Sequence, residues 1–568
     1  MFQSDAAVSD CERDRSRPVM LVGFQNQGNL GLGYLAAVLR RHGHAVHVVD
    51  IEQEPEAIAR MARELDPVLI GFSLIFQFYI DRYAQLLALL RSYGVACHFT
   101  IGGHFPSLSY RQTLELIPEL NSVVRFEGEM TLLELVDAVS TCKNWQAIQG
   151  IAFRHQDGIV ATPARALLGD LDQLPYPERN YSPSAVLGRP IMPIVASRGC
   201  ARTCSFCSIH TFYRAAPGKI VRTRRPAAVV QEMKSLHEEG GTRIFLFQDD
   251  DFPLFGPVWR RWALEFVDEL HRHGLPGEVI WKMNCRADVI DRELFLTLRD
   301  AGLYLVYMGL ESGSDRGLET LHKQITVEQN IRAVRLLKSI GLMWEYGFML
   351  LDPSSTFASV RENLTFLRTI LADGCLPVTF CRMLPYDGTP IKDALVRSGR
   401  LLGDICNPDY DFLDPRLSEF YEGLSDVVSL TGWIHGLEAV TQQLGCAWHE
   451  VAVMERLFPA LPGIGRYKQR LRRITKTSND LLLDVVEDLS YVYSDGRKNR
   501  WDPDQLEQSR ADVIKRLLTA RNEFVLRHQD LLLRALGVEN MPNLTEDAAG
   551  FEVSREASEG VERTPPGG

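Results

Sequence analysis

The chain contains two successive stretches in which short apolar runs alternate with segments of helical periodicity, and this pattern restricts the fold most strongly. Parallel strands need a long crossover between them, which is usually a helix. The first stretch has five apolar runs, at residues 19–24, 45–50, 68–73, 96–101 and 122–126. It predicts an open, doubly wound parallel sheet of the Rossmann-like (flavodoxin-like) kind, which binds ligands beyond the carboxyl ends of its strands.

The second stretch begins at about residue 191 and is longer. Its six expected strands are residues 191–197, 243–248, 279–284, 304–310, 344–350 and 378–384. Helical segments such as 226–239 and 327–340 separate them. Six strand–helix units are too many for a second small open sheet, so they predict a partial (β/α)6 barrel with its chemistry at the carboxyl ends of the strands.

The rest of the chain is arranged around these two units. We expect a Rossmann-like domain at 18–145, a linker at 146–190, the barrel at 191–400, a helical region at 401–542 and a disordered tail at 543–568. The linker contains a hairpin candidate at 150–160, and two prolines in 171–177 exclude regular structure there. Helical periodicity is clearest at 481–493 and 502–536, whereas the tail is rich in Glu, Gly and Pro.

Charge and composition exclude several classes of protein. A formal net charge of −11 over 568 residues disfavours a nucleic-acid partner, although residues 219–225 form a short basic run. Residues 1–17 have no apolar segment, and no apolar run reaches the roughly 18 residues that would span a bilayer. We therefore expect a cytoplasmic protein without membrane association. Eleven cysteines in so long a chain do not form a disulfide framework, so a tight group of them indicates metal binding or catalysis.

Three cysteines, Cys200, Cys204 and Cys207, form such a group directly after the first barrel strand. Three thiolates at this spacing can bind three corners of an iron–sulfur cubane, and a fourth cysteine would close the site. Without it, the fourth iron keeps an open coordination position, as catalytic metal sites do. The alternative is a closed zinc or cluster site with a distant fourth ligand, for which Cys285 at the end of the third barrel strand is the best candidate.

The CxxxCxxC spacing with an aromatic residue before the last cysteine resembles the signature of the radical S-adenosylmethionine (SAM) enzymes. The resemblance implies a [4Fe-4S] cluster on the three cysteines and SAM bound at the open iron. It also implies SAM contacts at the ends of the barrel strands, by Phe206, Asp249, Asp250, Glu311, Ser312 and Met349. The acidic triplet 249–251 departs from the GGE triplet that is common in this family, which puts the exact contact to the amino group of SAM in doubt.

A doubly wound domain before a radical SAM barrel resembles the cobalamin-binding domain of the cobalamin-dependent radical SAM enzymes. The residues that this resemblance assigns to cobalamin are Gly31, Gly33, Ser73, Leu74, Gly102, Gly103, His104, Glu127, Gly128 and Glu129. Glycines at strand ends permit close approach of the backbone to a large ligand. A DxHxxG segment is absent, which implies base-off binding, with residues 74–77 as candidates for the lower face of cobalt.

The two resemblances together imply a methyltransferase that uses SAM, the cluster and cobalamin. Its expected substrate is an unactivated carbon of a small-molecule or peptide natural-product intermediate, and its electrons come from an external donor such as flavodoxin or ferredoxin. One alternative is a non-methylating rearrangement or cyclisation, and another is methylation at phosphorus or an sp2 carbon. A methylthiotransferase and a non-enzymatic cobalamin or cluster sensor are weaker alternatives. Cys11, Cys97 and Cys142 are too scattered for the second cluster of a methylthiotransferase.

Aromatic and histidine side chains in the carboxyl-terminal helical region have two possible roles. Trp433, His435, Trp448 and Tyr491 could close the substrate cavity, but they are expected as core residues instead.

Overall fold

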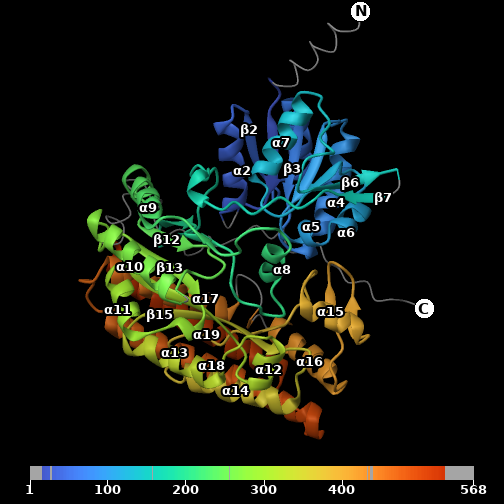
Figure 1. The fold of residues 1–568 in the computed structure, drawn as a ribbon. Helices are drawn as coiled ribbons and strands as arrows, with labels where there is room; N and C mark the ends of the chain where they lie inside the picture. The colour runs from blue at the N-terminus through green and yellow to red at the C-terminus, as the bar shows by residue number, and fades with distance from the viewer. Residues whose placement is uncertain are drawn as a thin grey trace, which may run out of the picture.

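A computed structural model describes residues 16–25, 28–156, 158–254, 256–430, 433–434 and 439–530. Figure 1 shows an amino-terminal α/β unit, a second α/β unit beside it, and helices α16 to α19 packed on the second unit. The expected tail at 543–568 and His435 lie outside the described residues. No helix in the described part of the chain is long and apolar enough to cross a membrane.

The amino-terminal sheet has the predicted doubly wound topology. Its strands are β1 (Val19–Gly23), β2 (Val46–Asp50), β3 (Leu69–Ser73), β4 (His98–Gly102) and β5 (Ser122–Val124), in the parallel order β2-β1-β3-β4-β5. The connecting helices are α2 (Leu30–Arg41), α3 (Pro55–Leu65), α4 (Ile80–Ser92), α5 (His104–Leu108), α6 (Tyr110–Leu116) and α7 (Glu129–Ser140). Every residue of β1 is buried, because hydrophobic cores lie on both faces of the sheet.

A hairpin extends this sheet beyond the range expected for the first domain. Strand β6 (Ile151–His155) pairs antiparallel with β5, and β7 (Gly158–Ala161) pairs antiparallel with β6. The hairpin expected at 150–160 within the linker range is therefore present, but it belongs to the sheet of the first domain. The later part of this range carries a short 3-10 turn, Leu171–Gln173, and the strand β8 (Ala185–Val186).

The second unit is an open, curved parallel sheet, as expected for a partial barrel. Its strands are β9 (Arg189–Ile194), β12 (Ile244–Phe247), β13 (Ile280–Cys285), β14 (Leu303–Glu311), β15 (Met343–Leu351) and β16 (Cys381–Arg382), with β8 antiparallel at the β9 edge. The helices of this unit are α8 (Ser208–Arg214), α9 (Pro226–Gly240), α10 (Gly256–Arg272), α11 (Arg292–Asp300), α12 (Asp315–Thr320), α13 (Val327–Ser339), α14 (Phe357–Leu371) and α15 (Pro390–Arg397). All six predicted strands are present.

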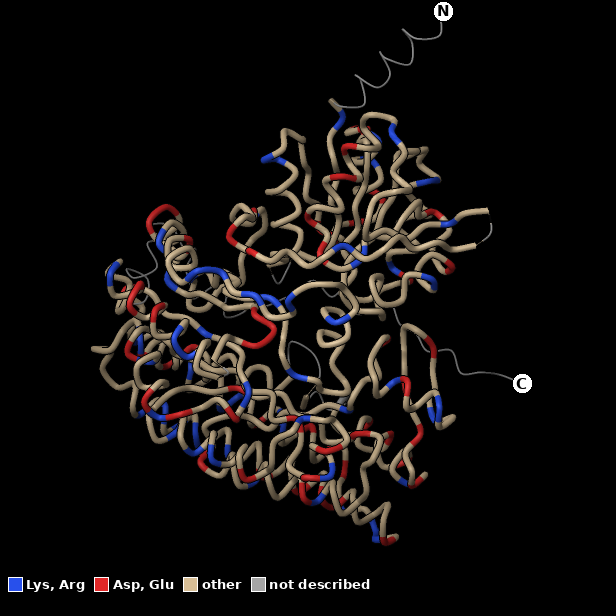
Figure 2. Tube along the Cα trace, viewed as in Figure 1, with Lys and Arg blue, Asp and Glu red and all other residues tan. Residues whose placement is uncertain are grey.

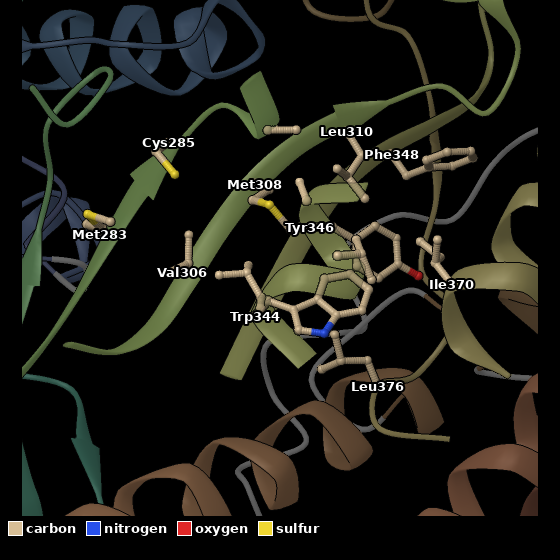
Figure 3. Close-up of a cluster of buried hydrophobic side chains, with 14 of the residues drawn as sticks. Met283, Cys285, Val306, Met308, Leu310, Trp344, Tyr346, Phe348, Ile370 and Leu376 are labelled. Carbon is tan, nitrogen blue, oxygen red and sulfur yellow. The ribbon is translucent and has the colours of Figure 1, made fainter. Parts of the chain in front are cut away.

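The two faces of the barrel sheet differ in burial. Met308 and Trp344 lie in a large buried cluster with side chains of the covering helices, such as Ile370 of α14 (Figure 3). Tyr307, next to Met308 on β14, points to the opposite, inner face. Its side chain is 38% exposed, so solvent reaches the inner face of the half-barrel.

The carboxyl-terminal region is helical except at its start. Residues 401–410, expected in the helical region, instead form a small hairpin of β17 (Leu401–Gly403) and β18 (Pro408–Tyr410). Helices α16 (Arg416–Leu430), α17 (Val440–Leu457), α18 (Ile464–Asp495) and α19 (Pro503–Arg527) follow. Trp433 and Trp448 lie in a hydrophobic core that these helices form, so both are core residues, and Tyr491 contacts Arg361 and Arg497.

One polar contact ties this region to the barrel. The Tyr304 hydroxyl of β14 lies 2.6 Å from Nε2 of His449 on α17, and the two rings stack. Burial lowers the pKa of His449 to about 4. The folded protein therefore holds this side chain neutral, while the unfolded chain takes up a proton below its ordinary pKa of about 6.5.

Folding should therefore lose stability as the pH falls through this window. Between about pH 7 and about pH 5 we expect His449 to account for a loss of about 2 kcal/mol. His449→Gln keeps an acceptor for Tyr304 but cannot titrate, so its melting temperature should fall less with acidification than that of the wild type. Thermal melts at several pH values measure this, and the same substitution at the exposed His155 is the control. Equal acid sensitivity of His449→Gln and the wild type would contradict the assignment.

Candidate functional site

The three cysteines lie on a loop between β10 (Ser197–Arg198) and α8, at the carboxyl end of β9. The loop begins at Gly199, whose φ of 87° and close approach to the Ile220 carbonyl leave no room for a side chain. Asp249, just past the end of β12, accepts hydrogen bonds from the Ala196 amide at 3.1 Å and the Ser197 hydroxyl at 2.5 Å. These contacts fix the start of the loop against the neighbouring strand.

The middle of the loop is held by two other segments of the barrel. The Ser205 amide donates to the Leu321 carbonyl at 3.0 Å, and its hydroxyl donates to Thr320 at 2.8 Å. The Ser205 carbonyl accepts from the Ile391 amide in the first turn of α15, also at 3.0 Å. The spacing of the cysteines is therefore set by a loop that is attached on several sides.

The thiols have the chemistry that a cluster requires. All three are free of disulfides and at least half-buried, and Cys204 accepts a contact from the Arg286 guanidinium at 3.8 Å. Burial and then Asp251 raise the pKa of Cys200 to about 12, and burial raises that of Cys207 to about 11. Such thiols are protonated by themselves, so iron binding would displace their protons. The donor set fits an iron–sulfur cluster.

Cys285, the candidate for a fourth ligand, belongs to a different environment. It is buried in the hydrophobic cluster with Met283 and Met308 (Figure 3). No three His, Cys, Asp or Glu side chains among the described residues converge as the ligands of one ion would. In a cubane each thiolate binds a different iron, so its ligands are more widely spread. The arrangement favours three thiolate ligands over a closed site that includes Cys285.

The acidic triplet after β12 divides into different roles. Asp249 is buried and both of its oxygens are used by the loop, which makes it a structural residue rather than a SAM contact. Asp250 is exposed and accepts the Gly199 amide at 2.8 Å. Asp251, which the sequence did not single out, lies with its carboxylate 3.9 Å from the Cys200 sulfur. Burial raises the Asp251 pKa to about 6.

Glu311 lies on the inner face of the barrel sheet, at the end of β14. Its φ of 64° and a register shift in the pairing with β15 turn the side chain back over Gly309, next to Gly347. One carboxylate oxygen is 3.0 Å from the ammonium of Lys323, and both residues are largely buried. The bare backbone of the two glycines makes room for this ion pair.

The other residues expected near SAM are distributed on both faces. Ser312 is buried, and its hydroxyl donates to Asn363 of α14 at 3.1 Å, so it braces the strand end. Met349 is half-buried on β15, and Phe206 is half-buried in the cysteine loop. Both pack against the edge of the barrel core.

Several glycines expected to face cobalamin approach the protein's own backbone instead. Gly33 of α2 lies against the Glu178 carbonyl and accepts its amide at 3.1 Å, and Gly103 lies against the Leu74 carbonyl. Gly102 is close to the Val124 carbonyl, Gly31 is close to Asn29, and Gly128 precedes α7. These positions explain why small residues occur there without a ligand.

The segment after β3 faces the barrel. The Ser73 carbonyl accepts the Tyr83 hydroxyl and Leu74 is buried. The buried Gln77 donates to the Ile405 carbonyl at 2.8 Å and accepts the Asp387 amide at 2.7 Å, which joins the amino-terminal unit to the turn after β16. Ile75 and Phe76 remain 43% and 45% exposed, with Phe76 stacked on Phe78. This apolar surface lies beside Tyr386 of the barrel.

Glu127 and Glu129 form ion pairs across the boundary between the two units. Arg222 of β11 (Arg222–Thr223), 1% exposed at its side chain, places Nη1 at 2.8 Å from both oxygens of Glu127. Arg198 of β10 lies 2.7 Å from Glu129 and 3.4 Å from Glu127. The Leu168 amide also donates to Glu127, at 2.9 Å. We call Glu127, Glu129, Arg198 and Arg222 the interdomain ion network.

Electrostatics keeps this network charged. Burial opposes ionisation of Glu127, but Arg198 and Arg222 outweigh it and lower the pKa of that carboxyl. Burial likewise opposes the charge on Arg198, whereas Glu129 and Glu127 raise its pKa. Arg222 and Arg224 of the 219–225 run are both buried in ion pairs, Arg224 with Glu232 at 2.5 Å. These two arginines are not part of a surface for nucleic acid.

His104 comes from the amino-terminal unit and approaches the cysteine side of the barrel. Its ring packs edge-on against Phe212 of α8, with centroids 4.5 Å apart. Burial lowers the pKa of His104, and Asp250 opposes this shift. Residues of both units therefore surround the cysteine loop.

Comparison with protein families agrees with this geometry. The model of the B12 binding domain matches residues 17–136, and that of the radical SAM superfamily matches residues 194–367. The first match covers the doubly wound sheet and the second starts at the end of β9, so it includes the cysteine loop.

Individual relatives share a low sequence identity with this chain, but the similarity extends over several hundred residues. An uncharacterized methyltransferase of Pyrococcus horikoshii is 28% identical over 379 residues, which cover 66% of this chain and 79% of the relative. The anaerobic magnesium-protoporphyrin IX monomethyl ester cyclase of Cereibacter sphaeroides is 30% identical over 347 residues, 58% of this chain and 55% of the relative. The chain thus spans little more than half of the cyclase.

A solved structure shares the overall fold. The cobalamin-dependent SAM radical enzyme OxsB, with aqua-cobalamin bound, superposes with a TM-score of 0.68 at 17% identity, over 95% of this chain and 81% of OxsB. The two matched domains are joined by the ion pairs of Glu127 with Arg222 and of Glu129 with Arg198, so the chain combines the B12 binding and radical SAM domains of the cobalamin-dependent radical SAM enzymes.

Proposed function

We propose that the protein is a methyltransferase that acts on an unactivated carbon of a small-molecule or peptide substrate, in the cytoplasm, with electrons from an external donor protein. The observation that carries this proposal is the interdomain ion network, because it attaches the cysteine loop directly to the B12 binding domain. A reaction in which one cofactor would activate a substrate carbon and the other would give it a methyl group requires that both reach the same substrate atom. Buried ion pairs between the two domains support a joint reaction over separate binding roles.

Different residues around the cysteine loop would bind the cluster, cobalamin and SAM. Cys200, Cys204 and Cys207 would hold the cluster, and the exposed Ile75 and Phe76 would offer cobalamin an apolar surface. When bound, the cluster with SAM supplies a carbon radical and cobalamin supplies a methyl group. Asp251 and the Glu311–Lys323 pair offer charged partners to the polar end of SAM. The apolar side chains on both sides keep water from the reacting atoms.

The inner face of the barrel offers polar groups to the substrate. Lys282 of β13 and Glu345 of β15 lie 3.7 Å apart, and both are partly accessible to solvent. Tyr307 lies between them on β14, and burial raises the pKa of its phenol, so it donates a hydrogen bond throughout the physiological range. We assign the polar part of the substrate to these three residues.

Cyclisation without methylation remains the second candidate function, favoured by the similarity to a cyclase. The mass of the product decides between the two, because only methylation adds one methylene.

The cluster assignment predicts a sharp difference between cysteines. After anaerobic reconstitution, Cys200→Ala, Cys204→Ala and Cys207→Ala should each lose most of the iron and sulfide and all release of 5′-deoxyadenosine from SAM. Cys285→Ala is the matched control, because it is buried in the hydrophobic cluster, and it should retain both. Loss of iron in Cys285→Ala as well as in the other three variants would support a closed four-cysteine site. The wild type should also retain near-stoichiometric cobalamin after desalting, and failure to do so would remove the methyltransferase proposal.

The interdomain ion network predicts the consequence of removing one charge. Glu127→Gln leaves the buried Arg222 poorly compensated, which costs about 3 to 5 kcal/mol for a buried pair. We expect the two units to separate more often, so that proteolysis in residues 162–184 accelerates by about tenfold or more. Glu134→Gln, which breaks the more exposed ion pair between Glu134 of α7 and Arg165, is the control and should change the rate little. If both variants were cleaved as slowly as the wild type, the network would not be what holds the units together.

A further inference from the structure

The amino-terminal unit is attached to the barrel beyond the carboxyl ends of three neighbouring strands, β3, β4 and β5. After β5 the attachment is the interdomain ion network, and Figure 2 shows blue segments of the chain between the two units. After β4 it is the packing of His104 on Phe212. After β3 it centres on an uncharged side chain, that of Gln77. These contacts determine how the carboxyl edge of the sheet faces the barrel.

Gln77 uses both ends of its amide in this attachment. The residue is only 2% exposed. Its Nε2 donates to the Ile405 carbonyl at 2.8 Å, and its Oε1 accepts the Asp387 amide at 2.7 Å. Ile405 lies in the turn of the β17–β18 hairpin and also packs against the core of the amino-terminal sheet. One buried side chain therefore holds two segments of the barrel side, 310 and 328 residues away along the chain.

The barrel segment that Gln77 holds leads directly to the cysteine loop. Asp387 lies in the turn between β16 and α15. Ile391, in the first turn of α15, donates its amide to the Ser205 carbonyl at 3.0 Å. Ser205 is part of the cysteine loop. Two hydrogen bonds and one short turn of chain thus connect Gln77 with the cluster site.

On its other side, Gln77 directly follows the apolar surface that cobalamin would use. Ile75 and Phe76 are the exposed residues of this surface. The rings of Phe76 and Phe78 each lie 5.9 Å from that of Tyr386, the residue before Asp387. The apolar surface is therefore linked to the same barrel turn by ring contacts and by the Gln77 amide. Its position relative to the barrel follows from these contacts.

Two attachments fix the orientation of a unit where one does not. Adjacent strands lie about 5 Å apart, so the ends of β3 and β5 are about 10 Å from each other. The ion network alone would leave the amino-terminal unit free to rotate about the end of β5. The hydrogen bonds of Gln77 are made two strands away, and they oppose this rotation at the side where Ile75 and Phe76 lie.

We propose that Gln77 is the positioning residue that sets the separation between the apolar surface for cobalamin and the cysteine loop. This inference rests on the proposed function, in which both cofactors reach one substrate atom. Gln77 acts through the backbone of Asp387 and Ile405, and it takes no part in the chemistry. The accuracy of this placement matters, because a misplacement of about 1 Å costs about hundredfold in rate.

The test compares two buried amides that have the same local environment. Gln77→Leu removes both hydrogen bonds and keeps a side chain of similar size. Asn479→Leu is the matched control, because Asn479 of α18 is 3% exposed, accepts the Val378 amide and donates to the Leu376 carbonyl, both at 2.8 Å. Each substitution leaves one buried amide and one buried carbonyl unpaired, so both should lower the melting temperature by similar amounts. Only Gln77 joins the barrel to the amino-terminal unit.

The affinity for hydroxocobalamin is the first measurement, by equilibrium dialysis against the cluster-loaded full chain. Gln77→Leu should bind about tenfold more weakly, because the apparent Kd rises tenfold when about one molecule in ten is competent to bind. Asn479→Leu should stay within about twofold of the wild type, since its hydrogen bonds lie far from the apolar surface. Both variants should release 5′-deoxyadenosine from SAM with dithionite at about half the wild-type rate or faster, because the cysteine loop is unchanged.

The separation itself is the second measurement. Pulsed EPR reports the dipolar coupling between the Co(II) form of bound cobalamin and the reduced cluster, which falls steeply with their distance. The wild type and Asn479→Leu should give one narrow distribution of distances, and Gln77→Leu a broader one. An unchanged distribution in Gln77→Leu, whatever its affinity, would overturn the positioning role, and so would an equal broadening in Asn479→Leu.

If Gln77→Leu does not accumulate as folded protein, Gln77→Asn replaces it. The shorter amide can reach only one of the two backbone partners, so the distribution should broaden less than without any amide, and a distribution equal to that of the wild type would overturn the positioning role. Failure of the wild type to bind hydroxocobalamin would instead contradict the proposed function itself.

Discussion

The buried guanidinium of Arg222 is the group on which the arrangement of the two units depends. A charge in this position is unfavourable unless a carboxylate compensates it, and Glu127, which makes the ion pair, comes from the other unit. Docking of the B12 binding domain and formation of the strand pair β10–β11 are therefore linked. Arg198, two residues before the first cysteine, binds Glu129 in the same way. The start of the cluster loop thus belongs to both units.

The strands of both sheets could be predicted from the sequence because their signal is local. Apolar runs such as 19–24 and 304–310 lie between helical segments. The connecting helices cover one or both faces of such strands, so the strands are apolar whatever the details of side-chain packing. The cysteine loop could be predicted for the same reason, since its three thiols lie within eight residues. The hairpin β6–β7 could be predicted from its turn, but its pairing with β5 could not, because nothing within 150–160 indicates it.

The roles of individual polar residues and glycines could not be predicted, because they depend on partners far along the chain. Glu127 and Glu129 have the appearance of ligand contacts until Arg198 and Arg222 are placed beside them. Gly33 is small because Glu178 of the connecting segment lies against it. In the triplet 249–251, adjacent side chains point in different directions, so a shared sequence motif hides one structural carboxylate and one that faces Cys200. The spacing of residues in a motif does not show whether a residue contacts the protein's own backbone or a cofactor.

On the inner face of the barrel, charged side chains that could bind ligands are stabilised by ion pairs with each other. Lys323 neutralises Glu311, and Lys282 neutralises Glu345, so each of these two carboxylates has a counterion. A ligand that carries both charges can insert into such a pair and replace each partner, which avoids the penalty for leaving a buried charge alone. SAM has an ammonium and a carboxylate at one end and fits this rule at Glu311. By the same reasoning, the Lys282–Glu345 pair favours a substrate with an ionic or zwitterionic end over a purely apolar one.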